Sequence, residues 1–419
     1  MFKNIKIFII SLALILISFS SIYAQNNYTI DVDSTYVTVV EVGGSEVRQV
    51  FSKDGDKKMY PASMTKLMTV YVALLNLKDL SEEVVIVNED IKGLYEKRAS
   101  MAGFRVNDKV SVEDLFYGAL LPSGADAAKT LARIVSGSEK KFVKLMNKTA
   151  KDLGMNNTNF TNTEGLHDDN HYSTTNDISL LMQQAVQHLE LKEIMSTMKY
   201  TTSNNKLSFI NSLQTYSANS QAKVGLIGGG KTGWTPEAGY CLTSYTDYFD
   251  KTIITVTGNS KTYAGQLVDH NLIYNDLINN THNVKVFDVD ETISSIPLNY
   301  SRDIKEYPFI TSEPISVEVP KIVGKDDLNV EVLSENFLNA PINKDQVVGE
   351  LKINYKDSEL YRSKFVNKEE ISRSNFLYYQ SMIIAWISLN KLKSLVIFTL
   401  LVLATYILIK QKRKNKVYI

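Results

Sequence analysis

Alternating apolar and polar positions mark two parts of the first 280 residues. Residues 36–51, YVTVVEVGGSEVRQVF, alternate on both sides of Gly43 and Gly44, and residues 239–249 and 251–259 alternate on both sides of a short break. Alternation with a period of two predicts strands with one buried face, and the short breaks predict tight turns. We therefore expect one hairpin near each end of this region.

The residues between these hairpins have helical periodicity instead. Over residues 63–77 the apolar side chains occur nearly all round the helix, which predicts a helix buried on most sides. Helical patterns dominate again from Ser111, which forms a Ser-x-x-Asp capping box with Asp114. Strands first, helices next and strands last predict an α+β domain over residues 25–280, in which helices pack on one antiparallel sheet.

The pattern changes at about Val284. Short alternating runs such as VKVFDV, ISVEVP and QVVGELKINY contain almost no helical periodicity, so we expect a small all-β domain over residues 281–365. Residues 366–394 predict a helical, partly amphipathic linker. Trp386 and two neighbouring tyrosines in this linker suit a membrane interface.

The N-terminus has the form of a secretory signal peptide. Lys3 and Lys6 precede an apolar run over residues 7–19, and a short cleavage segment, SIYA, ends at Ala24, with Ile22 in place of the usual alanine. The run is short for a membrane span, which needs roughly 20 residues. We expect residues 1–24 to be removed on export; an uncleaved anchor is the alternative.

A second apolar run, Leu395–Ile409, is followed by the basic sequence KQKRKNKVYI. This order predicts a transmembrane helix over residues 395–410 and a basic cytoplasmic tail over residues 411–419. A buried core helix is the alternative, which the adjoining basic residues disfavour. Together with an exported N-terminus, the pattern predicts a large extracytoplasmic part on a single C-terminal anchor.

Composition excludes several classes of function. The chain of 419 residues has 46 basic and 46 acidic residues and no basic block outside its tail, so nothing indicates nucleic-acid binding. Cys241 is the only cysteine, which rules out internal disulfides. We expect Cys241 to be a small residue of the core. The five histidines show no ligand spacing, so we expect no metal and no cofactor.

The stretch PASMTKLMT places Ser63 three residues before Lys66. Residues i and i+3 share one face of a helix, so Lys66 can reach the hydroxyl of Ser63 and act as its base. Lys66 must then be neutral near pH 7, although the ordinary lysine pKa is ~10.4; burial and a second cation, Lys231, are the available causes. Five other Ser-x-x-Lys pairs occur in the chain, so two ordinary polar side chains are the alternative.

Two further motifs give this pair a context. PSGADAA places Ser123 at a turn between two predicted helices, and GGGKTGWTPEAGYCL places Lys231, Thr232 and Gly233 on a predicted strand behind a glycine run. The same trio of motifs occurs in penicillin-binding proteins and β-lactamases. A solvated lysine on an edge strand and a serine that only caps a helix are the alternatives for Lys231 and Ser123.

Four blocks extend the similarity over roughly residues 30–275. YPASMTKLMT, SVEDLFYGALLPSGADAA, FVKLMNKTAKDLGMNNTNFTNTEGLHDDNHYSTTNDIS and KTGWTPEAGYCL resemble the low-molecular-mass D-alanyl-D-alanine carboxypeptidases. The later β-domain resembles the C-terminal domain of that family at APINKDQVVGELKINY. The resemblance implies a β-lactamase/transpeptidase-like fold, with an antiparallel sheet and a helical cluster, followed by a small all-β domain and a C-terminal transmembrane helix.

The resemblance also implies roles for individual residues. Ser63 would be the nucleophile that carries the acyl ester, Lys66 its general base, and Ser123 a proton relay toward the leaving amine. Lys231 and Thr232 would hold the terminal carboxylate of the substrate.

The strand that carries Lys231 and Thr232 would supply the remaining groups of the site. Gly233 and Thr235 would line the same binding strand, and the backbone N–H groups of Ser63 and Trp234 would form the oxyanion hole. Trp234 itself would be a wall of the cleft. His167 and His171 lie in a block to which the family gives a structural role.

One position departs from the family. Ala125 stands where the second motif normally has an asparagine whose amide holds the substrate backbone. The adjacent Asp126 matches a separate aspartate of the family pattern, so one polar contact with the substrate is missing.

The terminal segments predict an exported, membrane-anchored protein, and the resemblance implies a serine-type D-Ala-D-Ala carboxypeptidase of the bacterial cell wall. It would trim the terminal D-alanine from peptidoglycan stem pentapeptides without a cofactor, with β-lactam antibiotics as inhibitors and membrane lipid as a partner of the C-terminal helix. The alternatives are a β-lactamase, which shares the motif trio, and a degenerate, non-catalytic wall-binding protein, which only Ala125 supports.

Overall fold

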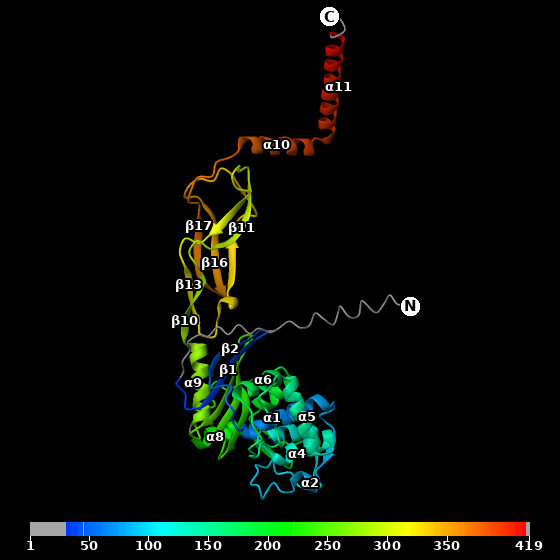
Figure 1. Ribbon diagram of the computed structural model, residues 1–419, viewed down its shortest axis with the longest axis vertical. Coiled ribbons are helices and arrows are strands. Elements are labelled where there is room, and N and C mark those ends of the chain that lie inside the picture. Colours follow the sequence, from blue (N-terminus) through cyan, green and yellow to red (C-terminus); the bar gives the residue numbers. More distant parts are fainter. Residues whose placement is uncertain (1–30, 45, 221, 416–419) are drawn as a thin grey trace, which may run out of the picture. The chain divides into compact units, whose positions relative to one another are not determined.

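The structure is a computed structural model that describes residues 31–44, 46–220 and 222–415. The predicted signal peptide (1–24) and the side chains of the predicted tail (411–419) lie outside the described residues. The chain divides between Asn280 and Thr281 into two compact units, which are described separately below (Figure 1).

The first unit is built on one five-stranded antiparallel sheet in the order β2-β1-β9-β8-β7. Its strands are β1 (Tyr36–Gly43), β2 (Glu46–Lys53), β7 (Gly229–Thr235), β8 (Gly239–Tyr248) and β9 (Lys251–Ser260). β1 pairs with β2 and β8 with β9, so both predicted hairpins are confirmed. β1 also pairs with β9, which joins the two hairpins into the single sheet that the sequence predicts. β7 lies at one edge of this sheet.

Helices cover both faces of the sheet, with α9 on one side and the larger cluster on the other (Figure 1). The helices are α1 (Thr65–Asn76), α2 (Asn88–Ile91), α3 (Val112–Leu120), α4 (Ala125–Ser136), α5 (Glu139–Asp152), α6 (Thr175–Ala185), α7 (Leu189–Ser196), α8 (Ser212–Ser220) and α9 (Gly265–Asn279). A 3₁₀ turn, η1 (Ala62–Met64), precedes α1, and short strand pairs link the helices: β3 (Glu83–Val85) with β4 (Lys109–Ser111), and β5 (Lys199–Thr201) with β6 (Ser208–Ile210).

Successive side chains along each strand point to opposite faces of the sheet, and each face contributes to a separate buried region. Tyr245 on β8 and Val256 on β9 pack into the large core that the helical cluster shares with the sheet. Ser244, the neighbour of Tyr245, points to the other face, where its hydroxyl lies 2.6 Å from Nδ1 of His270 and 2.7 Å from the hydroxyl of Tyr274, both on α9. The large core includes most of α1, as its all-round apolar pattern predicts.

The predicted capping box starts α3. The backbone N–H of Ser111 donates to the Asp114 carboxylate, and the N–H of Asp114 donates to the Ser111 hydroxyl, each at 3.0 Å. Asp114 also accepts hydrogen bonds from the hydroxyls of Tyr200 and Ser203. The cap therefore ties α3 to the segment that follows α7.

The second unit is rich in short antiparallel strands. They are β10 (Thr281–Phe287), β11 (Thr292–Asn299), β12 (Glu306–Ile310), β13 (Ile315–Pro320), β14 (Asn329–Leu333), β15 (Leu338–Asn339), β16 (Val347–Tyr355) and β17 (Ser358–Val366), with the 3₁₀ turn η2 (Lys325–Asp327). They form the sheets β10-β13, β12-β11-β15 and β14-β16-β17. Phe309, Leu351 and Ile353 are among its fully buried side chains, so the predicted small β-domain has its own core.

Two helices follow this β-domain. α10 (Asn375–Leu389) is capped by Ser374 and therefore occupies only part of the predicted helical linker of residues 366–394. The preceding residues are held by Asn367, whose amide donates to the carbonyls of Asn343 and Glu369. α11 (Lys391–Asn415) contains a 20-residue apolar span, Lys391–Lys410, which is not buried in the protein.

Candidate active site

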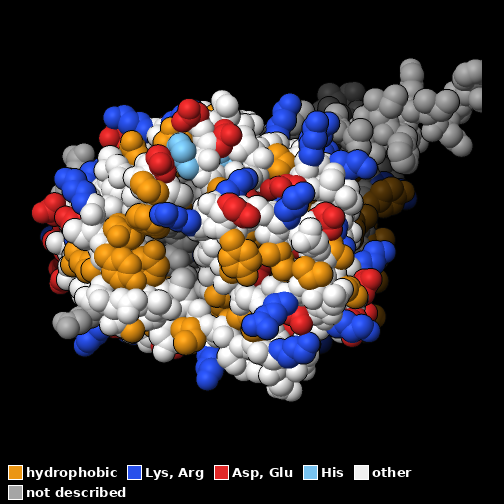
Figure 2. Space-filling view, turned by 90° about the horizontal axis from the view of Figure 1, so that it is seen from below, with side chains coloured by type: hydrophobic (Ala, Val, Ile, Leu, Met, Phe, Trp, Pro, Cys, Tyr) orange, Lys and Arg blue, Asp and Glu red, His pale blue; other side chains and the backbone are white. Residues whose placement is uncertain are grey.

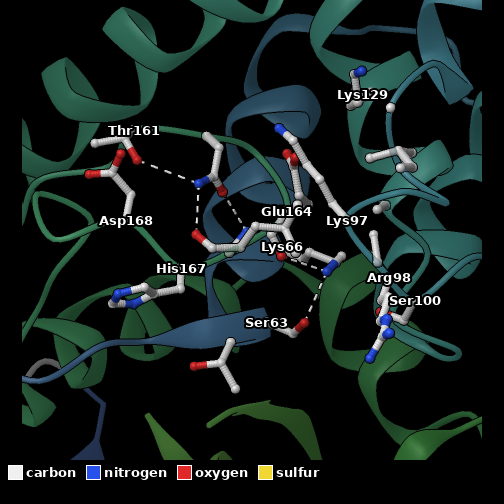
Figure 3. Close-up of a pocket in the computed structure, with 18 of the residues that line it drawn as sticks. Ser63, Lys66, Lys97, Arg98, Ser100, Lys129, Thr161, Glu164, His167 and Asp168 are labelled. Carbon is white, nitrogen blue, oxygen red and sulfur yellow. Dashed lines mark hydrogen bonds between the residues drawn. The ribbon is translucent and has the colours of Figure 1, made fainter. Parts of the chain in front are cut away.

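Ser63 lies in the 3₁₀ turn η1, immediately before α1 rather than within it. The turn is closed by a hydrogen bond from the N–H of Met64 to the carbonyl of Pro61 (3.1 Å). Lys66 lies in the first turn of α1, and its Nζ donates to the hydroxyl of Ser63 at 3.0 Å (Figure 3). The structure therefore brings the predicted serine and lysine into contact.

The side chain of Lys66 is 1 % exposed. Its Nζ also donates to the backbone carbonyl of Glu164 at 2.6 Å. Burial lowers the pKa of Lys66 to about 8, against the opposing attraction of the Glu164 and Asp126 carboxylates. The lysine is therefore held beside the serine in an environment that favours loss of its proton.

Lys231 on β7 is fully buried, which excludes the solvated edge-strand alternative. Its Nζ donates to the carbonyl of Thr232 at 3.0 Å. Burial, followed by repulsion from Lys66, holds the pKa of Lys231 well below its usual range. The sequence led us to expect burial and Lys231 to lower the pKa of Lys66; in the structure burial is the main cause of that shift, and repulsion between the two lysines lowers the pKa of Lys231.

Two glycines allow the backbone to approach Ser63 closely. A Cβ on Gly233 of β7 would lie 2.9 Å from the carbonyl oxygen of Pro61 and 3.2 Å from the backbone nitrogen of Ser63. A Cβ on Gly165, which has φ +79°, would lie 1.9 Å from the carbonyl oxygen of Ala62. The turn that carries Ser63 is therefore packed between strand β7 and the segment that follows Glu164.

The second motif is placed at the start of α4. Ser123 has φ 66°, and its buried hydroxyl has no hydrogen-bond partner in the described part of the chain. Ala125 lines the same cavity as Ser63, with no polar group at the position of the expected amide. Asp126 does not replace that amide, because its carboxylate accepts hydrogen bonds from the backbone N–H groups of residues 102–104 at 2.8–3.0 Å.

The remaining residues of β7 take different positions. The Thr232 hydroxyl donates to Ser212 on α8 at 2.7 Å. Trp234 is 49 % exposed and lines the cavity, as expected for a wall of the cleft. Thr235 also lines the cavity, and its hydroxyl accepts from the N–H of Ala238 at 3.1 Å.

The two histidines near the site do not contact Ser63 by any hydrogen bond among the described residues. His171 is buried, and burial lowers its pKa to about 4; its Nε2 lies 2.8 Å from the hydroxyl of Thr65. His167 stands edge-on to Tyr60 at the wall of the cavity, with ring centroids 4.7 Å apart. Cys241 is a buried core residue, and burial raises its thiol pKa to about 11.

A cavity of about 880 Å³ opens beside Ser63 and Lys66. Figure 3 shows its two sides: Thr161, His167 and Asp168 on one, and Lys97, Arg98, Ser100 and Lys129 on the other. Its volume lies within the usual range for sites that bind small molecules or short peptides. No group of acidic, histidine or cysteine side chains in the described residues has the arrangement of a metal site.

Sequence reasoning missed a pair of carboxyl groups next to Lys66. Glu164 accepts hydrogen bonds from the N–H and hydroxyl of Thr163 at 3.0 and 2.9 Å, and the same hydroxyl lies 3.3 Å from Oε1 of Glu139. Burial and the nearby charge of Glu164 raise the pKa of Glu139. The only available signal was the TEGL segment within the third family-like block, which does not reveal that Glu139 joins it.

Comparisons with known proteins agree with this site. The family described as D-alanyl-D-alanine carboxypeptidase matches residues 24–262, and the family described as penicillin-binding protein 5, C-terminal domain, matches residues 282–373. The chain is 27 % identical over 338 residues to the D-alanyl-D-alanine carboxypeptidase DacF of Bacillus subtilis (strain 168), which covers 79 % of this chain and 84 % of that one.

A curated relative and a solved structure from Haemophilus influenzae are also similar. The D-alanyl-D-alanine carboxypeptidase DacA is 31 % identical over 301 residues, covering 71 % of this chain and 75 % of that protein. The crystal structure of penicillin-binding protein 5 aligns with a TM-score of 0.55 and 25 % identity, covering 82 % of this chain and 99 % of that one. These matches extend over both units of the chain.

Replacing Gly165 by alanine tests the packing of the Ser63 turn. Gly165→Ala should slow acylation by a penicillin at least tenfold and lower the melting temperature, because the new Cβ displaces the backbone of Ala62. The matched control is Gly154→Ala: Gly154 has a nearly equal φ of +81°, but its Cβ would meet only a side-chain carbon of Leu180 at 3.9 Å. Equal acylation rates in the two variants would contradict the role given to this contact.

Proposed function

Because this chain belongs to the D-alanyl-D-alanine carboxypeptidase family, we propose that Ser63 is the residue through which it removes the terminal D-alanine of peptidoglycan stem peptides. The enzyme is a serine-type, penicillin-binding hydrolase. The single observation that supports Ser63 as its nucleophile is the 3.0 Å hydrogen bond from Lys66, inside a cavity wide enough for a peptide.

The reaction takes two steps. The hydroxyl oxygen of Ser63 attacks the carbonyl carbon of the penultimate D-alanine while its proton passes to Lys66. The C–N bond then breaks, the proton held by Lys66 passes to the amine of D-alanine, and the acyl group stays on Ser63 as an ester. A water molecule attacks this ester and passes a proton to Lys66, which gives it to the departing oxygen of Ser63, so that the shortened peptide and free Ser63 are released.

Lys66 suits the role of general base because its ammonium form is destabilised. A lysine with a pKa of about 8 is neutral in about one molecule in ten at pH 7, whereas an unperturbed lysine is neutral in fewer than one in a thousand. The carbonyl of Glu164 accepts a hydrogen bond from the same nitrogen, which orients it toward Ser63.

Ser123, Lys231 and Thr232 complete the proposed chemistry. The hydroxyl of Ser123 has no partner in the described residues and is free to relay a proton to the leaving amine. Lys231 and Thr232 would bind the terminal carboxylate, and a bound anion would favour the charged form of Lys231. Gly233 supports this arrangement because it brings β7 to the backbone nitrogen of Ser63.

The oxyanion of the tetrahedral intermediate needs donors of its own. We assign them to the backbone N–H groups of Ser63 and Trp234, which belong to the turn and the strand that pack together here. The matches to the carboxypeptidase family and to its C-terminal domain favour this reaction over a β-lactamase. The intact contact between Ser63 and Lys66 argues against a non-catalytic wall-binding protein, despite Ala125.

The proposed location is the outer face of the bacterial cell membrane. A helix of 20 residues rises about 30 Å, enough to cross the hydrocarbon core of a bilayer, and Lys391–Lys410 has this length with no part buried in the protein. Export depends on the N-terminal segment, which lies outside the described residues.

A penicillin should add its whole mass to one residue of the protein, because opening of its lactam ring gives the same ester on Ser63. Intact-mass analysis should detect the adduct, and Ser63→Ala should abolish it while the circular dichroism spectrum is unchanged. An adduct that survives Ser63→Ala would show that another residue is the nucleophile.

The acylation rate should rise with pH and level off above about pH 8, since only neutral Lys66 can accept the proton. Below that pH the rate should fall up to tenfold for each pH unit. Lys66→Ala should slow acylation by about 10²–10⁴-fold and remove this pH dependence. Stopped-flow measurements with a penicillin check both points; an unchanged pH profile in Lys66→Ala would assign the titration to another group.

Removal of residues 395–419 should release the enzyme from the membrane, since it takes away most of the apolar span. The truncated and full-length proteins would be expressed with the same N-terminus and compared by membrane fractionation. Retention of the truncated protein in the membrane fraction would mean that another segment anchors it.

A further inference from the structure

Four basic side chains line one side of the active-site cavity: Lys92, Lys97, Arg98 and Lys129. We call them the basic wall. None of the four forms an ion pair with an acidic side chain in the described part of the chain. Lys92, Lys97 and Arg98 are exposed, and Lys129 is half-buried, with its Nζ 3.2 Å from the carbonyl of Lys92. Their charges are therefore directed at the solvent and at the cavity.

The loop that carries most of this wall is held in place. The N–H of Arg98 donates to the carbonyl of Tyr95 at 3.0 Å, and Arg98 has a left-handed φ of 53°, a conformation that a non-glycine residue rarely adopts. Ser100 fixes the end of the loop: its hydroxyl donates to the carbonyl of Ser123 at 2.7 Å, and its carbonyl accepts from the N–H of Ala125 at 2.8 Å. The wall is therefore positioned relative to α4.

The opposite side of the cavity carries the other sign of charge. Asp168 and Glu237 line it, together with His167, whose Nδ1 lies 3.9 Å from the Glu237 carboxylate. Figure 2 draws one face of the molecule, on which acidic, basic and hydrophobic side chains lie close together.

Glu139 and Glu164 also line the cavity, and Lys129 lies near the Glu139 carboxyl group. The exposed pair Lys97 and Arg98 is therefore the part of the basic wall most available to an anionic group.

The position of the cavity relative to β7 indicates which part of a substrate it receives. Trp234 and Thr235 line the cavity, but Lys231 and Thr232 do not. If Lys231 and Thr232 hold the terminal carboxylate, as the proposed function states, the peptide that precedes the scissile bond extends away from them. That part of the peptide would lie between the two charged walls.

We propose that the basic wall binds a free carboxylate on the stem-peptide residue that precedes the D-alanyl-D-alanine pair. The enzyme then discriminates between stem peptides in which this carboxylate is free and those in which it is amidated. Lys97 and Arg98 are the main determinants, because Lys129 is half-buried and its charge already acts on the nearby Glu139 carboxyl group. This inference rests on the proposed placement of the terminal carboxylate.

The test uses two peptides, acetyl-X-D-Ala-D-Ala, in which X is 2-aminopimelate or its side-chain amide. Their Kd values are measured on the full chain carrying Ser63→Ala, so that binding is read without hydrolysis. At low salt the carboxylate peptide should bind about three- to tenfold more tightly, which is the range expected for two solvent-accessible ion pairs. Adding Lys97→Gln and Arg98→Gln should bring the ratio of the two Kd values to about one.

The control removes the same charge elsewhere. Lys144→Gln with Lys151→Gln, two exposed positions on α5 that do not line the cavity, should leave the ratio unchanged. In the protein with an intact wall, raising the salt concentration should move the ratio toward one, since mobile ions screen exposed charges. This measurement needs no substitution in the wall.

Three results would overturn the proposal: equal binding of the two peptides at low salt, a preference that survives Lys97→Gln with Arg98→Gln, or no binding of either peptide. Failure of the proposed function has a different signature. In that case the carboxylate preference and its loss in the double variant persist in the binding assay, but the unmodified enzyme releases no D-alanine from either peptide.

Discussion

The site depends on the burial of two lysine side chains beside one serine. Lys66 and Lys231 are almost entirely removed from solvent, and burial lowers the pKa of both. For Lys66 the shift from 10.5 to about 8 corresponds to roughly 3 kcal/mol by which the ammonium form is disfavoured. Packing elsewhere in the protein has to offset this unfavourable free energy. The lowered pKa makes Lys66 a usable base.

Close packing of backbone segments supplies this support. The turn that carries Ser63 lies between β7, at Gly233, and the segment at Gly165, and neither position has room for a side chain. The edge of the sheet and the helical cluster thus meet at the serine itself. Because Lys66 donates to the carbonyl of Glu164, which adjoins Gly165, the same segment positions both the serine turn and the lysine.

The sequence predicted the sheet, the helical cluster and the β-domain because hydrophobic residues follow a period of two in strands and a helical period in helices. It also predicted the contact between Ser63 and Lys66 from their spacing of three residues, although Ser63 lies in the turn before α1 and not in the helix itself. It could not predict the start of α10, since Asn367 holds the preceding residues through hydrogen bonds with no periodic pattern. It likewise missed the pairing of Glu139 with Glu164, which depends on how α5 packs against a loop.

The two groups of cations in the cleft differ in burial, and this difference separates their effects. Lys66 is buried, and burial is the main cause of its lowered pKa, whereas Lys97 and Arg98 are exposed. Exposed charges are screened over about 8 Å at physiological salt, whereas buried ones are screened much less. Substitutions in the exposed wall can therefore change which stem peptide binds without changing the basicity of Lys66. A cleft built in this way allows recognition and acylation chemistry to vary independently.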